Sequence, residues 1–126
     1  MVPTPDAHSD IPALRDRLME RACIDLLEQA LEMGEQELEA LESGQTDLAS
    51  AREEERSRLT QQALELSGDV PLDILLVEFQ KLCDIQKRLT TAGNELRRSW
   101  QQELTRARGE SRRLAGYRQA TSHALN

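Results

Sequence analysis

The sequence predicts an all-α protein: an antiparallel helical hairpin or bundle of three long helices, with coiled-coil packing and a hinged C-terminal segment. Leucine, glutamate, glutamine, arginine and alanine dominate the 126 residues, and these residue types lose little side-chain freedom in a helix. Only 4 prolines and 6 glycines interrupt the chain. β-branched residues are sparse and do not alternate with polar ones, so no strand is indicated.

The first helix is expected over residues 11–43, after a disordered arm at 1–10. Asp10 stands in the N-cap position and Pro12 in the first turn, where the missing N–H of proline costs little. An apolar seam with three- and four-residue spacing follows: Cys23, Leu27, Leu31, Gly34, Leu38 and Leu41.

Two glycines have specific roles in this prediction. Gly34 lies on the apolar seam, where the lack of a side chain allows a neighbouring helix to approach closely. Gly44 follows the last apolar residue of the first helix and suits the C′ position, which favours a left-handed backbone conformation.

The second helix is expected over residues 46–66 and the third over 72–108, beginning next to Pro71. Glycines weaken the helix further on, so 109–119 is expected to be a hinged extension and 120–126 a flexible tail. The single helical domain thus covers residues 11–119.

Two ladders with a seven-residue repeat run along the third helix and predict a coiled-coil seam. They consist of Leu75, Leu82, Leu89, Leu96 and Glu103, and of Phe79, Gln86, Gly93, Trp100, Ala107 and Leu114.

Charge is distributed unevenly along the chain. Residues 1–66 carry 16 acidic and 6 basic side chains, whereas residues 67–126 carry 7 acidic and 10 basic ones. This asymmetry favours antiparallel packing of the C-terminal helix along the acidic first helix, or separate use of the two surfaces.

The sequence lacks a run of 18 apolar residues and the features of a signal peptide, so we expect a cytoplasmic protein without membrane insertion. Cys23 and Cys83 occupy helical positions that look buried and are expected to be reduced packing residues.

No catalytic constellation is recognisable. The 2 histidines, His8 and His123, lie in opposite terminal arms, and no phosphate-binding or zinc-binding motif occurs. We therefore expect no enzyme activity, no cofactor and no metal. Arginines near the C-terminus could bind nucleic acid, but the chain is acidic overall and Tyr117 alone is not a stacking platform. Recognition by helices remains, with Trp100 as an interface anchor.

Two segments carry a resemblance to a known family. "LEALESGQTDLASAREEERSRL" is a leucine-rich helix, a glycine-led break and a second helix, with Arg56 twelve residues after the glycine. "VEFQKLCDIQKRLTTAGNELRRSWQQELTRARGESRRLAGYRQ" is a long helix that ends in a basic, glycine-containing segment and Tyr117. Over about residues 22–119 the chain resembles the small flagellar type III export chaperones of the FliT and FlgN type. Thr46 stands where an aromatic residue is frequent in the FliT group, and Arg118 stands where the FlgN group tends to have a glycine. The C-terminal sequence "RRLAGYR" slightly favours the FliT group.

The resemblance implies a cytoplasmic chaperone that binds the C-terminal amphipathic segment of a secreted filament cap or hook–filament junction protein. It would prevent premature assembly and deliver this cargo to the export apparatus without a cofactor. The implied cargo surface consists of Leu89, Leu96, Trp100, Leu104, Leu114 and Tyr117. The alternatives are a self-associating structural coiled coil, for which a homodimer is one form, and a nucleic-acid-binding protein that uses the basic C-terminus.

Overall fold

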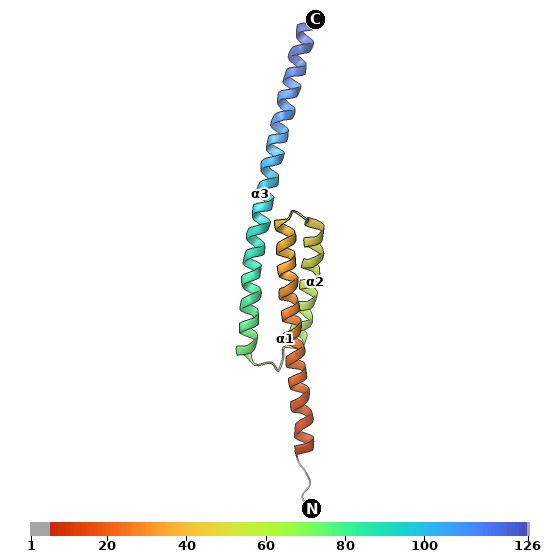
Figure 1. The fold of residues 1–126 in the computed structure, drawn as a ribbon, viewed down its shortest axis with the longest axis vertical. Helices are drawn as coiled ribbons and strands as arrows, with labels where there is room; N and C mark the ends of the chain where they lie inside the picture. The colour runs from red at the N-terminus through yellow and green to blue at the C-terminus, as the bar shows by residue number, and fades with distance from the viewer. Residues whose placement is uncertain (1–5, 126) are drawn as a thin grey trace, which may run out of the picture. The chain divides into compact units, whose positions relative to one another are not determined.

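The computed structural model describes the backbone of residues 6–125 and the side chains of residues 11–122. Three helices account for nearly all of this part: α1 (Asp6–Glu42), α2 (Thr46–Glu65) and α3 (Leu72–Leu125) (Figure 1). The predicted all-α class with three helices is confirmed. The chain divides into two units, residues 1–92 and residues 93–126, with the boundary inside α3.

In the first unit, α1, α2 and the beginning of α3 lie side by side, and the chain direction alternates from each helix to the next (Figure 1). α3 therefore runs parallel to α1 here. Of the two alternatives that the charge asymmetry favoured, antiparallel packing of these two helices is wrong, and separate use of the two surfaces stays a prediction. The reason is the chain path: two short connections reverse the direction twice and leave the first and third helices pointing the same way.

The turn between α1 and α2 has the hydrogen bonds of a Schellman motif. The Gly44 N–H donates to the Leu41 carbonyl at 3.1 Å, and the Gln45 N–H donates to the Ala40 carbonyl at 2.8 Å. Gly44 has a φ of 72°, a conformation that costs glycine little because it has no Cβ. The predicted role of Gly44 as the C′ residue is confirmed.

Helix α1 begins five residues before the expected start, at Asp6, and residues 6–10 are part of it. Asp10 is therefore not its N-cap, and Pro12 lies inside the helix instead of in its first turn. Pro12 can be accommodated because its ring fixes φ near the helical value, although the helix loses one backbone hydrogen bond.

Helix α3 continues to Leu125 without the expected end at 108 or the hinge at 109–119, and residues 120–125 of the expected flexible tail are helical. Residue 126 lies outside the described residues, as do residues 1–5 of the expected N-terminal arm. Gly44 is the only glycine with a positive φ in the described part of the chain, so Gly109 and Gly116 keep helical backbone angles. Each costs only about 1 kcal/mol relative to alanine, and the arginine, glutamine, alanine and leucine residues around them favour the helix.

The core of the first unit consists of two clusters. One contains Cys23, Leu27, Ala63, Val70 and Leu75, from all three helices and the second connection. The other contains Leu38, Ile85 and Leu89, from α1 and α3.

Two members of the first ladder, Leu75 and Leu89, are buried, whereas Leu82 and Leu96 are partly buried and Glu103 is exposed. Ile85 takes the core position next to this ladder, and Gln86, a member of the second ladder, is exposed. Since successive helix residues are rotated by about 100°, only one of these neighbours can face the core.

Gly34 provides the predicted close approach. A Cβ at this position would lie 3.1 Å from Ile85 Cγ1 and 3.4 Å from Arg56 Cδ. Beside it, Arg56 Nε donates a hydrogen bond of 2.9 Å to Glu37 Oε2, and both side chains of this ion pair are largely withdrawn from solvent. Side chains from all three helices thus meet around Gly34 and one ion pair that is largely withdrawn from solvent.

The two cysteines differ in environment. Cys23 is fully buried, and its thiol donates to the Ala63 carbonyl at an Sγ–O distance of 3.3 Å. Cys83 is exposed, so the expectation that both are packing residues is wrong for Cys83, which follows the inward-facing Leu82 by one residue. Both thiols are free.

Candidate docking surfaces

The second unit carries an exposed apolar row on one side of α3, which we call the α3 stripe: Leu96, Trp100, Leu104, Leu114 and Tyr117. Their spacing places these residues on adjoining positions of one helix face. Leu96 is partly buried, whereas Trp100, Leu104, Leu114 and Tyr117 are 54, 51, 59 and 77% exposed. Between residues 93 and 122, no side chain is buried.

Leu89 does not belong to this surface. It is 5% exposed and packs against Leu38 and Ile85 in the first unit. Because so little of its side chain is accessible and it lies in the first unit, its assignment as a cargo-binding residue of this surface is corrected to a core residue. The sequence did not distinguish the two roles, because Leu89 and Leu96 occupy successive positions of the same seven-residue ladder.

Charged side chains of both signs lie along the α3 stripe. Glu103 and Glu110 continue the seven-residue spacing of Leu96 and Tyr117, and the rotation of about 100° per residue places Arg106 and Arg113 beside these glutamates. Glu103 pairs with Arg106, with 2.8 Å between Glu103 Oε2 and Arg106 Nη2, but both side chains remain mostly exposed. A helix that lies along this stripe therefore meets carboxylates as well as guanidinium groups.

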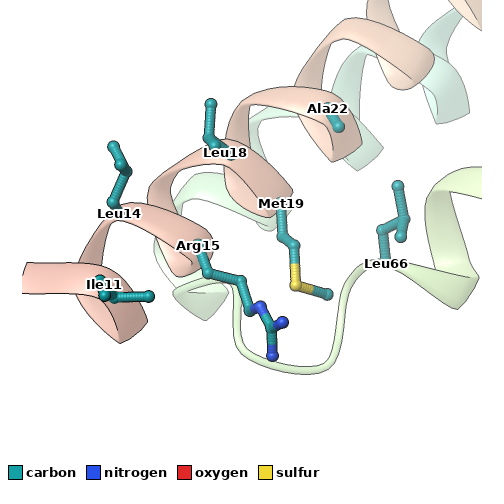
Figure 2. A pocket seen from close by; sticks show the side chains of 7 residues that line it. All are labelled: Ile11, Leu14, Arg15, Leu18, Met19, Ala22 and Leu66. Carbon is teal, nitrogen blue, oxygen red and sulfur yellow. The ribbon is translucent and has the colours of Figure 1, made fainter. Parts of the chain in front are cut away.

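A second apolar surface lies in the first unit, at the beginning of α1. It is an open groove of about 390 Å³ between α1 and Leu66, the residue that follows α2, and we call it the α1 groove (Figure 2). It is lined by Ile11, Leu14, Arg15, Leu18, Met19, Ala22 and Leu66. In Figure 2, Met19 and Leu66 lie on the two sides of the groove, and Arg15 extends beside Met19.

Sequence reasoning missed the α1 groove. The signal was present, since Ile11, Leu14 and Leu18 repeat at intervals of three and four residues and Ala22 follows four residues later. Such spacing indicates an apolar face without saying whether another part of the chain covers it. In the structure Ile11 and Leu18 are 67 and 62% exposed.

Comparisons with protein-family models, with curated proteins and with solved structures find no match for this chain. Within residues 6–125, none of the helices has a stretch that is both long and apolar enough to span a membrane. The described residues also contain no group of three or more His, Cys, Asp and Glu side chains placed to hold a metal ion.

Proposed function

We propose that this chain is a helical binding protein that captures an amphipathic segment of another protein along the α3 stripe. The observation that carries the proposal is the exposure of Trp100, Leu104 and Leu114 on one face of α3. Soluble proteins rarely leave large aligned apolar side chains uncovered unless the surface binds a partner. Tryptophan at such a position is a frequent anchor, because it buries a large area at a small cost in side-chain entropy.

The cargo we propose is the C-terminal segment of a secreted flagellar protein, either the filament cap or a hook–filament junction protein. This part of the proposal rests on the resemblance to flagellar export chaperones. The cargo segment would fold into a helix on the stripe, with its apolar face toward Trp100, Leu104 and Leu114. The bound chaperone would prevent assembly before export and present the cargo to the export apparatus.

Trp100 is the single tryptophan of the chain, so it reports directly on this surface. Peptides from the C-termini of cap and junction proteins that lack tryptophan are added to the full-length protein, and tryptophan fluorescence is followed. We expect a blue shift on binding, because the indole leaves water. In calorimetry, Trp100→Ala should weaken binding by about 2 kcal/mol, or roughly thirtyfold.

Lys87→Ala provides a matched control, since Lys87 is exposed on α3 but belongs to the first unit and lies outside the stripe. Unchanged affinity after Trp100→Ala and Leu104→Ala would show that the cargo binds elsewhere. If no cap or junction peptide binds at micromolar concentration, the flagellar assignment is refuted, even if other amphipathic helices bind.

The second candidate is self-association through the same stripe. Leu96 and Trp100 continue the two seven-residue ladders that are typical of a coiled-coil seam. This alternative predicts a dimer in sedimentation equilibrium that Trp100→Ala and Leu104→Ala weaken. A monomer at 100 times the cargo dissociation constant would exclude it.

A further inference from the structure

We propose that the α1 groove is a second docking site and that it takes an amphipathic helix of another protein with carboxylates along both edges. This inference does not rest on the function proposed for the α3 stripe. It is built from the first unit alone, and it would hold even if the stripe bound nothing.

Exposed isoleucine and leucine side chains are aligned along the α1 side of the groove. Ile11, Leu14 and Leu18 are each more than half exposed and succeed one another along a single face of α1. Leu66 forms the opposite side of the groove (Figure 2). A helix whose apolar residues repeat at three- and four-residue intervals has the matching periodicity.

The charge around the groove determines the class of partner. Arg15 is among the lining residues, and the rotation of about 100° per residue places Arg21 at the other edge of the same face. Asp16 and Glu20 fall on the opposite side of α1 by the same rule. Arg21 lies 3.7 Å from Asp25 (Nε to Oδ1), an exposed contact that leaves 80% of the arginine side chain accessible and contributes little.

These arginines stand out because the rest of the first unit is acidic. Residues 1–92 contain 20 acidic and 9 basic side chains, and from residue 22 to residue 51 there is no arginine or lysine at all. A basic partner would be attracted to that acidic stretch, whereas an apolar helix with acidic edges finds both an apolar surface and complementary charge at the groove, from Arg15 and Arg21.

The same charges disfavour a second copy of this chain as the occupant. A symmetric contact between two α1 grooves would place Arg15 and Arg21 of one copy close to the same residues of the other. It would also bring together two units that each carry an excess of 11 negative charges. Like charges that face one another across an interface oppose association.

Fluorescence anisotropy with the full-length protein tests the inference. The probe is a fluorescein-labelled synthetic peptide of 18 residues, with leucines at three- and four-residue spacing and glutamates along both edges. A second peptide has lysine in place of each glutamate. We expect the glutamate peptide to bind at least about tenfold more tightly than the lysine peptide at low salt.

Three variants locate the binding site. Leu18→Gln should weaken binding of the glutamate peptide by about tenfold or more, because one leucine contact is lost. Leu104→Gln is the matched control from the α3 stripe, with a similarly exposed leucine, and should leave this binding unchanged. Arg15→Glu should remove the preference for the glutamate peptide. Since all three positions are exposed, thermal melting by circular dichroism should not change.

Four results would overturn the inference: no binding of the glutamate peptide, equal affinity for both peptides, a larger effect of Leu104→Gln than of Leu18→Gln, and a dimer that Leu18→Gln dissociates. The last result would identify the occupant as a second copy of the chain.

Discussion

Replacing Gly34 with alanine should destabilise the first unit, although alanine is the better helix former. The added Cβ would lie 3.1 Å from Ile85 Cγ1, 3.3 Å from Ile85 Cγ2 and 3.4 Å from Arg56 Cδ. Ile85 is 2% exposed, and as a β-branched residue it has few alternative side-chain conformations. Arg56 is held by its hydrogen bond to Glu37. Neither neighbour can move away without disturbing the core or the ion pair.

Two opposing effects set the magnitude. The gain in helix propensity from glycine to alanine is about 1 kcal/mol. Overpacking a well-filled core costs about 1–3 kcal/mol, and the contacts at Gly34 are short enough to place it near the middle of that range. We expect Gly34→Ala to lower the free energy of unfolding by about 1 kcal/mol.

Gly93→Ala is the matched control. Gly93 also lies inside a helix, but a Cβ there would have no atom within 4 Å, so only the propensity gain of up to about 1 kcal/mol applies. Urea unfolding followed by far-ultraviolet circular dichroism measures the free energy of unfolding of both variants. Gly34→Ala should lower it and Gly93→Ala should raise it, so the two variants should differ by about 2 kcal/mol. The reasoning is refuted if Gly34→Ala is as stable as Gly93→Ala at equal m-values.

Four further predictions concern the same unit. Glu37→Ala should lower the free energy of unfolding by about 3 kcal/mol because Arg56 loses its partner, and changing both residues to methionine should recover most of the loss in urea titrations. Leu27→Ala should cost about 3 kcal/mol in the same assay, since Leu27 is fully buried. A thiol reagent should label Cys83 rapidly and Cys23 only on unfolding. Burial raises the pKa of the Cys23 thiol. The contribution of the neutral thiol to the free energy of unfolding is therefore fully present below the ordinary thiol pKa and is lost as pH rises through the raised value. Cys23→Ala should remove this loss of stability at alkaline pH.

Local sequence patterns were sufficient to predict the three helices and the turn between α1 and α2. The position of Gly44 after the last apolar residue of α1 predicted the left-handed C′ conformation, because few residues other than glycine adopt it readily. Gly34 was predicted to permit a close approach from its place on the apolar seam, and Ile85 and Arg56 are the residues that make it.

The helix ends at the two termini were predicted less well. Relative to alanine, glycine inside a helix costs about 1 kcal/mol and proline about 3 kcal/mol. In the structure these costs do not end the helices, because α1 extends before Pro12 and α3 passes through Gly109 and Gly116.

The sequence by itself determined that the chain is helical, where the first turn lies and which residues can share an apolar face, because these properties depend on residues within a few positions of one another. Only the tertiary structure decided which apolar residues are covered. Leu89 and Trp100 follow the same period, yet Leu89 is buried against Leu38 and Trp100 is more than half exposed. Ile11 and Leu18 likewise continue a regular pattern without being covered. Burial depends on what packs against a face, and helical periodicity contains no information about that neighbour.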